Sequence, residues 1–222
     1  CLMKKTELLT RLGLTDPCEG FINDPNIKLW GWNGGSELFG KLIERFDPKL
    51  IIEVGSWMGQ STINMATCLK QQGKEDSCVI AVDTWLGSRE HWIEPELRVH
   101  LKLQHGFPTF YYDFLSNVVN HGVGVKVMPI PMPSSIGSEY LYNKLGGEIS
   151  ELIYVDGSHE QQDVYQDLTG YWKLLKPDCI VFGDDYDWEG VNTAVHGFAA
   201  EVGTPVLQLG GPFWALRKQP KH

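Results

Sequence analysis

Short, continuous apolar runs alternate along this chain with longer segments whose apolar residues recur every three or four positions. Continuous runs are typical of buried strands, and the recurring spacing is typical of amphipathic helices. The pattern predicts strands at residues 50–54, 79–83, 125–130, 152–155, 180–183, 206–209 and 213–217. It predicts helices at residues 36–46, 61–72, 111–120, 135–145, 161–175 and 190–202.

The alternation of strands and helices indicates an α/β protein. We expect a Rossmann-like, doubly wound, mostly parallel seven-stranded sheet that ends in an antiparallel hairpin around Gly210-Gly211-Pro212. We assign residues 36–222 to this domain, and we expect residues 1–35, a short helix and an irregular segment, to pack on it. Residues 84–115 are irregular and rich in aromatic residues, so they are a candidate lid.

Charge and cysteine content narrow the class of protein. The net charge is −9 and no cluster of Lys and Arg is present, which argues against nucleic-acid binding and favours a small neutral or cationic substrate. No apolar run has the length of a membrane span or of a signal-peptide core. The cysteines form no Cys-x-x-Cys motif. We expect Cys68, Cys78 and Cys179 to be buried free thiols, which indicates the cytoplasm.

Residues 51–62 run from an apolar strand through a turn with Gly55 and Gly59 into a predicted helix. The free backbone N–H groups at a helix start, beside a turn of small residues, can bind a polar ligand. The next strand ends at Asp83, which resembles the ribose-binding acid of nucleotide-binding folds. Together these features predict a cofactor that contains adenosine.

Acidic residues end four of the predicted strands, at Glu53, Asp83, Asp156 and the pair Asp184-Asp185. Ligands bind outside the carboxyl ends of the strands in such a sheet. We expect Asp156, Asp184 and Asp185 to converge there, because three carboxylates suit a hard cation such as Mg²⁺. Without a cation these carboxylates would repel one another.

His159 follows Asp156 on the loop that leaves the strand, so it can overhang the predicted metal site as a general base. The other histidines lack that context: His91, His100, His105, His121, His196 and His222. Aromatic residues in the irregular segments are candidates for the wall of an acceptor pocket. They are Trp30, Trp32, His91, Trp92, Phe110, Tyr111, Tyr112, Tyr186 and Trp188.

Two further positions are weaker candidates for cofactor binding. Trp85 lies close after Asp83, where an aromatic residue, or Leu86 beside it, can stack on an adenine. Ser134 and Ser135 follow the third predicted strand and can hydrogen-bond the edge of a base, although a Ser-Ser pair is also a good helix cap.

Four motifs occur in this order: Glu53-Val54-Gly55-Ser56-Trp57-Met58-Gly59-Gln60-Ser61, Val82-Asp83-Thr84-Trp85-Leu86-Gly87-Ser88, Tyr154-Val155-Asp156-Gly157-Ser158-His159 and Gly183-Asp184-Asp185-Tyr186. Together they resemble the class I S-adenosylmethionine-dependent methyltransferases over roughly residues 30–217. More narrowly, they are similar to the metal-dependent small-molecule O-methyltransferases related to catechol O-methyltransferase and to the macrocin-type sugar O-methyltransferases.

The resemblance implies that Glu53, Gly55 and Gly59 line the methionine side of the cofactor and that Asp83 holds its ribose hydroxyls. The candidate cofactor-binding residues are Glu53, Gly55, Ser56, Gly59, Ser61, Thr62, Asp83, Thr84, Trp85, Ser134, Ser135 and Asp156.

The resemblance also implies that Asp156, Asp184 and Asp185 bind the metal, Mg²⁺ or another divalent cation. The catechol enzymes carry Asn where this chain has Asp185, and a catalytic Lys where it has His159. The macrocin-type enzymes are closer at both positions, which favours His159 as the base and argues against a catechol-type substrate.

The resulting hypothesis is a Mg²⁺-dependent O-methyltransferase that uses S-adenosylmethionine to methylate a hydroxyl of a sugar, a natural product or a phenolic diol. One alternative keeps the fold but methylates RNA or protein. Another is an NAD-dependent oxidoreductase, although the first motif lacks G-x-G-x-x-G. A third is a non-catalytic cofactor-binding protein, against which the three acids and His159 argue. The aromatic segments are compatible with a homodimer.

Overall fold

A seven-stranded sheet forms the centre of this computed structural model, which describes residues 4–220. The strands are β1 (Leu50–Val54), β2 (Cys78–Asp83), β3 (Val127–Pro131), β4 (Ser150–Val155), β5 (Leu175–Gly183), β6 (Val206–Gly210) and β7 (Phe213–Arg217). Their order is β3-β2-β1-β4-β5-β7-β6. The first five strands pair in parallel, and β7 pairs antiparallel with β5 and with β6. The predicted fold class is confirmed.

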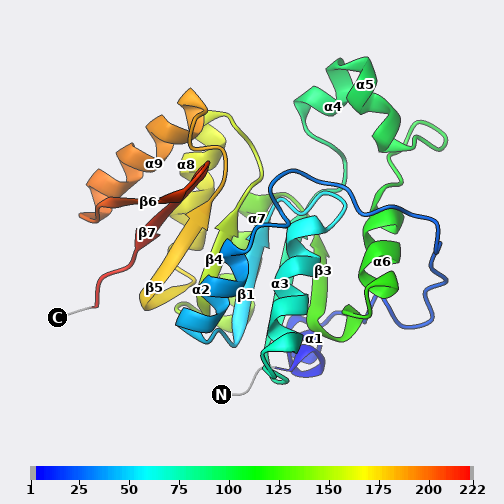
Figure 1. The fold of residues 1–222 in the computed structure, drawn as a ribbon, viewed down its shortest axis with the longest axis horizontal. Helices are drawn as coiled ribbons and strands as arrows, with labels where there is room; N and C mark the ends of the chain where they lie inside the picture. Colours follow the sequence, from blue (N-terminus) through cyan, green and yellow to red (C-terminus); the bar gives the residue numbers. More distant parts are fainter. Residues whose placement is uncertain (1–3, 221–222) are drawn as a thin grey trace.

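Helices cover both faces of the sheet (Figure 1). They are α1 (Lys5–Leu12), α2 (Leu38–Phe46), α3 (Gln60–Gln71), α4 (Arg89–Ile93), α5 (Pro95–Arg98), α6 (Tyr111–Asn120), α7 (Ser134–Leu145), α8 (Gln161–Tyr171) and α9 (Glu189–Val202), with 3-10 turns η1 (Val99–Leu101) and η2 (Gly124–Lys126). Helices α1, α7, α8 and α9 bury their apolar residues against one face, and α2, α3 and α6 bury theirs against the other.

The central strands are apolar throughout because both of their faces are covered. Ile52 and Ile80 point into the core beneath α1, α7, α8 and α9, whereas Ile51 and Val79 point into the core beneath α2, α3 and α6. All four side chains are fully buried. This explains why β1 and β2 read as continuous apolar runs rather than alternating ones.

The end of helix α8 and the start of strand β5 differ from the prediction. Helix α8 ends at Tyr171 and β5 already begins at Leu175, although we expected the helix to run to residue 175. Leu175 pairs with Ser150 ahead of a register shift in the β4–β5 ladder. Pro177, which has no N–H to donate, lies in this irregular part of the strand, where such a residue is tolerated.

The third strand begins at Val127, later than predicted, because the residues before it form η2. Val125 is exposed there, whereas Lys126 is buried. The Lys126 ammonium donates hydrogen bonds to main-chain carbonyls in the turn before β2. This buried, hydrogen-bonded charge fixes a turn where the apolar pattern alone indicated a strand.

Residues 84–115, predicted as irregular, contain α4, α5 and η1. Helices α4 and α5 stand above the edge of the sheet at which α3 begins (Figure 1). Several of the large apolar side chains of this segment are exposed: Leu86, Trp92, Ile93, Val99, Leu103 and Phe107. The segment is therefore placed where a lid over that edge would lie.

The N-terminal region packs on the sheet from both sides. Leu8 and Leu12 of α1 belong to one core, and Phe21 and Leu29 of the following segment pack against the other. The division of the chain at residue 36 stays a prediction. No helix in the described range 4–220 is long and apolar enough to cross a membrane.

The cysteines in the described range are free thiols. Cys78 is buried, as expected, while Cys68 and Cys179 are only partly buried.

Candidate active site

The carboxyl ends of β1, β2, β4 and β5 lie along one edge of the sheet (Figure 1). The strand order reverses at β1, because β2 and β3 follow on one side of it and β4 and β5 on the other. Such a reversal is where open α/β sheets bind their ligands. Asp83 ends β2, Glu53 is the last residue but one of β1, and Asp156 and the Asp184-Asp185 pair directly follow β4 and β5. These predicted site residues therefore gather at this edge.

The loop after β1 requires glycine at two positions. Gly55 has a φ of 83°, and a Cβ atom there would overlap the main-chain oxygen of Asp156. Gly59 precedes α3 with a φ of 92° and lies against the ring of Phe114. Glycine allows this backbone conformation and lets the loop pass close to the end of β4. The main chain at the start of α3 is therefore shaped as a cofactor loop requires.

Glu53 is fully buried beneath this loop and organises it. Its carboxylate accepts hydrogen bonds from the hydroxyl groups of Ser56, Ser61 and Thr62. Burial raises the pKa of Glu53 to about 7, and the hydroxyl donors offset part of that rise. The structure thus brings four candidate cofactor residues together, and their mutual contacts tie the loop to α3. Direct contact with a cofactor stays a prediction.

Asp83 holds two loops by their main chains. One carboxylate oxygen accepts from the N–H groups of Ser56 at 2.8 Å and Trp57 at 2.9 Å, and the other accepts from Trp85 at 2.7 Å. A carboxylate has about four acceptor positions, so Asp83 can still bind a ligand hydroxyl. Trp57 and Trp85 have φ values of 48° and 50°. Such left-handed backbone in bulky residues is strained, and strain of this kind gathers at functional sites.

Asp156, Asp184 and Asp185 lie together at the ends of β4 and β5. Burial raises the pKa of Asp156 well above its usual range, and the charges of Asp184 and Asp185 raise it further. Burial also raises the pKa of Asp184. In the described range, no lysine or arginine forms an ion pair with any of the three carboxylates. The three acids therefore lie close enough to act on one another electrostatically, and their role as metal ligands stays a prediction.

His159 is held beside this cluster by Asp185 and Trp188. Its Nε2 lies 2.9 Å from Oδ2 of Asp185, and its ring stacks on Trp188 with centroids 4.3 Å apart. The hydrogen bond with Asp185 is the main cause that raises the pKa of His159. With Nε2–H donating to the carboxylate, Nδ1 is the nitrogen that can accept a proton. The charge of Glu90, on α4, also raises the pKa of His159, so α4 lies within electrostatic range of this site.

The three carboxylates have the chemistry of a metal site, but their side chains are not arranged as one. Three carboxylates that have no lysine or arginine partner among the described residues, and that contact the imidazole of His159 through Asp185, suit a hard divalent ion. Yet among residues 4–220 no group of three or more His, Cys, Asp or Glu side chains is arranged to hold a metal ion. Asp185 is directed to His159, and Asp156 accepts a hydrogen bond from the Tyr154 hydroxyl at 2.9 Å. The residues fit a cation by their chemistry, but their side chains do not form a complete site.

The ring of Trp85 is not open to an adenine, whereas the role of Thr84 in cofactor binding stays a prediction. The Trp85 indole is only 2% exposed and packs on Tyr111 and Phe114, so the ring belongs to the core. Leu86 is more exposed and is the apolar side chain that remains available for stacking on an adenine. The Thr84 hydroxyl accepts a hydrogen bond from the Leu86 N–H group, which shapes the turn after β2.

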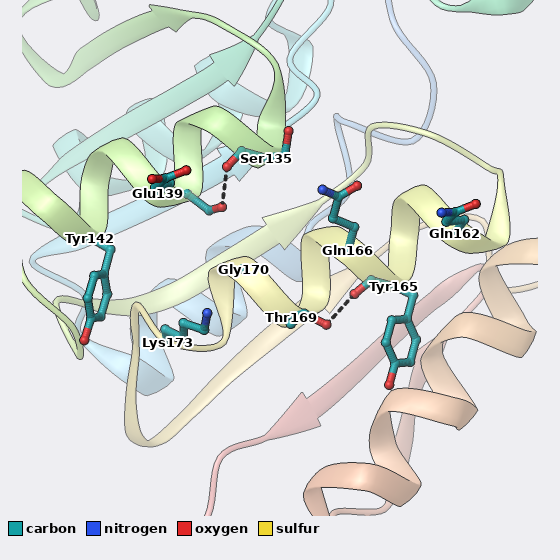
Figure 2. Close-up of a pocket in the computed structure, with 10 residues that line it drawn as sticks. Ser135, Glu139, Tyr142, Gln162, Tyr165, Gln166, Thr169, Gly170 and Lys173 are labelled. Atoms are coloured by element: carbon teal, nitrogen blue, oxygen red, sulfur yellow. Dashed lines mark hydrogen bonds between the residues drawn. The ribbon is translucent and has the colours of Figure 1, made fainter.

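Ser134 and Ser135 begin α7, and their contacts lead away from the acids. The Ser134 hydroxyl bonds to Asp167, whose pKa burial raises to about 6. Ser135 lines a groove of about 790 Å³ between α7 and α8 (Figure 2). The groove contains neither the strand-end acids nor His159, so it is separate from the candidate site. Its lining residues are Ser135, Ser138, Glu139, Tyr142, Gln162, Tyr165, Gln166, Thr169, Gly170 and Lys173.

Two residues that hydrogen-bond Asp184 and Asp156 were not predicted from the sequence. The Asn33 side chain hydrogen-bonds Asp184, and its own φ is 52°. Asn33 lies in an irregular segment, where no pattern marks it. Tyr154 stands two residues before Asp156 in β4, so strand alternation directs both side chains to one face and could have revealed the pair. Of the remaining histidines, His222 lies outside the described residues.

The sequence matches a methyltransferase-domain family over residues 52–186, more than half of the chain. The protein therefore belongs to this methyltransferase family, and the predicted class, an S-adenosylmethionine-dependent methyltransferase, is confirmed. The matched region contains Gly55, Asp83, His159 and the acids at the ends of β4 and β5. This membership contradicts the oxidoreductase alternative. No curated protein matches the chain.

Several solved structures share the fold. The O-methyltransferase NovP is 14% identical to this chain, with a TM-score of 0.61 and coverage of 83% of this chain and 79% of that one. An O-methyltransferase from Bacillus cereus in complex with SAH is 16% identical, with a TM-score of 0.57 and coverage of 87% and 84%. CalS11, a TDP-rhamnose 3'-O-methyltransferase of calicheamicin biosynthesis, is 21% identical, with a TM-score of 0.57 and coverage of 81% and 77%. At these identities the likeness establishes the common architecture.

Proposed function

We propose that this methyltransferase transfers the methyl group of S-adenosylmethionine to a hydroxyl oxygen of a small molecule, with a divalent cation and with His159 as the base. The observation that carries the proposal is the gathering of Asp156, Asp184 and Asp185 beside His159 at the cofactor edge of the sheet. Oxygen ligands for a hard cation beside a base suit an acceptor whose oxygen must lose a proton.

The residues at this edge of the sheet would each have a distinct role in methyl transfer. S-adenosylmethionine supplies an electrophilic methyl group, and a cation held by the three acids would favour the ionised form of a bound hydroxyl. His159 takes the hydroxyl proton at Nδ1, because Nε2 is engaged by Asp185. Asp185 orients the imidazole ring and stabilises its protonated form. The loop around Gly55 and the carboxylate of Asp83 hold the cofactor in line with the acceptor oxygen, and this positioning supplies much of the acceleration.

A small acceptor agrees better with the protein surface than RNA does. The net charge of −9 opposes RNA binding. Trp188 stacks on His159 and is still 52% exposed, so it can form one wall for the ring of a sugar or a phenol. The sugar substrate named for CalS11 makes sugars a reasonable first group of acceptors to test. Methylation of protein, a homodimer and a cytoplasmic location stay predictions.

The test is methyl transfer from labelled S-adenosylmethionine to a panel of sugars, diols and phenols, with Mg²⁺ and with a chelator. The substitution His159→Ala should lower turnover by about 10²- to 10⁴-fold and leave the cofactor Kd unchanged. The control His121→Ala alters an exposed histidine at the end of α6 and should match the wild type. Normal turnover of His159→Ala would remove His159 from its role. Cofactor binding without transfer to any hydroxyl compound would contradict the proposed acceptor.

A further inference from the structure

His91 connects the segment above the sheet to the cofactor loop. It belongs to α4 and is 7% exposed. Its ring stacks on the indole of Trp57, with centroids 4.0 Å apart and planes 29° apart. Trp57 lies in the loop between β1 and α3, and its main-chain N–H donates to Asp83. The stacked pair therefore lies beside the residue expected to hold the ribose.

The hydrogen bonds of His91 determine which ring nitrogen carries its proton. The main-chain N–H of Ser88 donates to Nδ1 at 3.2 Å, and the Ser88 hydroxyl lies 2.7 Å from the same nitrogen. A nitrogen that accepts from a main-chain N–H has no proton of its own, so the neutral ring carries its proton on Nε2. Burial lowers the pKa of His91 and thereby favours this neutral form. Nε2–H is consequently a hydrogen-bond donor.

Two donors on these stacked rings have no acceptor. Nε2 of His91 and Nε1 of Trp57 are shielded from solvent, and neither has a hydrogen-bond partner within the described residues. A buried donor without a partner has lost its hydrogen bonds to water and gained none in return, which is unfavourable. The neighbouring Trp85 indole, by contrast, donates to the Trp57 carbonyl at 2.9 Å. The fold thus satisfies the adjacent donor and leaves these two for a group from outside the chain.

The chemistry of the surrounding groups selects a hydroxyl. The Asp83 carboxylate can only accept, and its charge is close enough to act on His91. The N–H groups of His91 and Trp57 can only donate. A hydroxyl both donates and accepts, so it can satisfy the carboxylate and an N–H group at once. The ribose of S-adenosylmethionine carries two adjacent hydroxyl groups, one for each unpaired donor.

We propose that His91 and Trp57 are cofactor-binding residues whose side-chain N–H groups bind the ribose hydroxyl oxygens together with Asp83. The inference rests on the proposed function, since it assumes the same cofactor. It also assigns a task to α4. This helix supplies a direct ligand contact from the 84–115 segment.

The test separates the two nitrogens of His91 by calorimetric titration with S-adenosylhomocysteine. His91→Asn places an acceptor near the position of Nδ1, which keeps the contact with Ser88 and removes the Nε2 donor. His91→Gln places an N–H donor near the position of Nε2 and removes the Nδ1 acceptor. We expect His91→Asn to raise Kd about three- to tenfold, as for one lost hydrogen bond, and His91→Gln to stay closer to the wild type. The reverse order would show that His91 only caps α4 and would overturn the proposal.

Two more variants and one analogue complete the test. Trp57→Phe keeps a ring for stacking and should also raise Kd. The control His105→Asn alters an exposed histidine of the same segment, and it should leave Kd unchanged. The 2′,3′-dideoxy analogue of S-adenosylhomocysteine should bind wild type and His91→Asn equally. A persistent difference would overturn the assignment to ribose. If the wild type does not bind S-adenosylhomocysteine, the proposed function fails instead.

Discussion

The buried carboxyl group of Glu53 should make the stability of the protein fall as the pH rises. Burial raises its pKa from the ordinary 4.5 to about 7 in the folded protein. Between these two values the folded protein keeps a proton that the unfolded chain has already lost. The free energy of unfolding therefore decreases with increasing pH across this window, and the contribution is constant below and above it.

The size of the effect follows from the two values. At about 1.4 kcal/mol per pH unit, the difference between 4.5 and about 7 corresponds to about 3 kcal/mol. The substitution Glu53→Gln removes the titrating proton. The variant also loses the charged acceptor for Ser56, Ser61 and Thr62, which lowers its stability. Because glutamine does not titrate, this loss of stability does not vary with the protonation of residue 53. The stability of Glu53→Gln relative to the wild type should therefore rise by about 3 kcal/mol as the pH rises from about 4.5 to about 8.

Urea unfolding at a series of pH values measures this difference directly. Titrating groups that do not interact with Glu53 are common to the two proteins and cancel in the comparison. Asp156 does not cancel fully, because the charge of Glu53 also raises its pKa. The control is Glu44→Gln, which removes the same charge from an exposed position on α2. A relative stability that does not change with pH, or that decreases as the pH rises, would refute the reasoning for Glu53.

Three further substitutions probe the loop, the N-terminal helix and the acceptor wall. Gly55→Ala should lower the free energy of unfolding by at least about 1–2 kcal/mol, because φ is 83° and the added methyl group meets the Asp156 carbonyl. In the control Gly35→Ala the methyl group meets no atom within 4 Å, and equal melting temperatures for the two variants would contradict the argument. Leu8→Ala should lower the unfolding free energy by about 2–5 kcal/mol, since the side chain is fully buried; an unchanged urea midpoint would mean that α1 does not belong to the folding unit. Trp188→Ala should raise the acceptor KM severalfold in steady-state kinetics and leave the cofactor Kd unchanged, whereas an unaltered KM would remove Trp188 from the acceptor wall.

The apolar pattern predicted most elements because their burial is fixed locally by the sheet. Helix α6 has the predicted bounds, Tyr111–Asn120, and β1 has the predicted bounds, Leu50–Val54. The errors occur where a distant contact decides the structure. The start of β5 depends on the pairing of Leu175 with Ser150, and the late start of β3 depends on the buried Lys126 ammonium. Neither contact leaves a local signal in the sequence.

The same distinction applies to the site. Asp156 and Asp184 could be predicted because parallel strands end at a common edge. The pairing of Asp185 with His159 could not, because it depends on the course of two loops. His91 shows this limit most clearly. No spacing marks it, and its unpaired nitrogen becomes apparent only when the fold stacks its ring on Trp57.

The most direct test of the central claim is calorimetric titration of the protein with S-adenosylmethionine, NAD and then Mg²⁺, repeated with Asp184→Ala. The matched control is Asp187→Ala, which alters an exposed acid close by in the chain. We expect binding of S-adenosylmethionine, no binding of NAD, and a Mg²⁺ signal that is present in the wild type and in Asp187→Ala but lost in Asp184→Ala. A wild type that binds S-adenosylmethionine without any Mg²⁺ signal, or a signal that survives in Asp184→Ala, would contradict the metal-assisted mechanism.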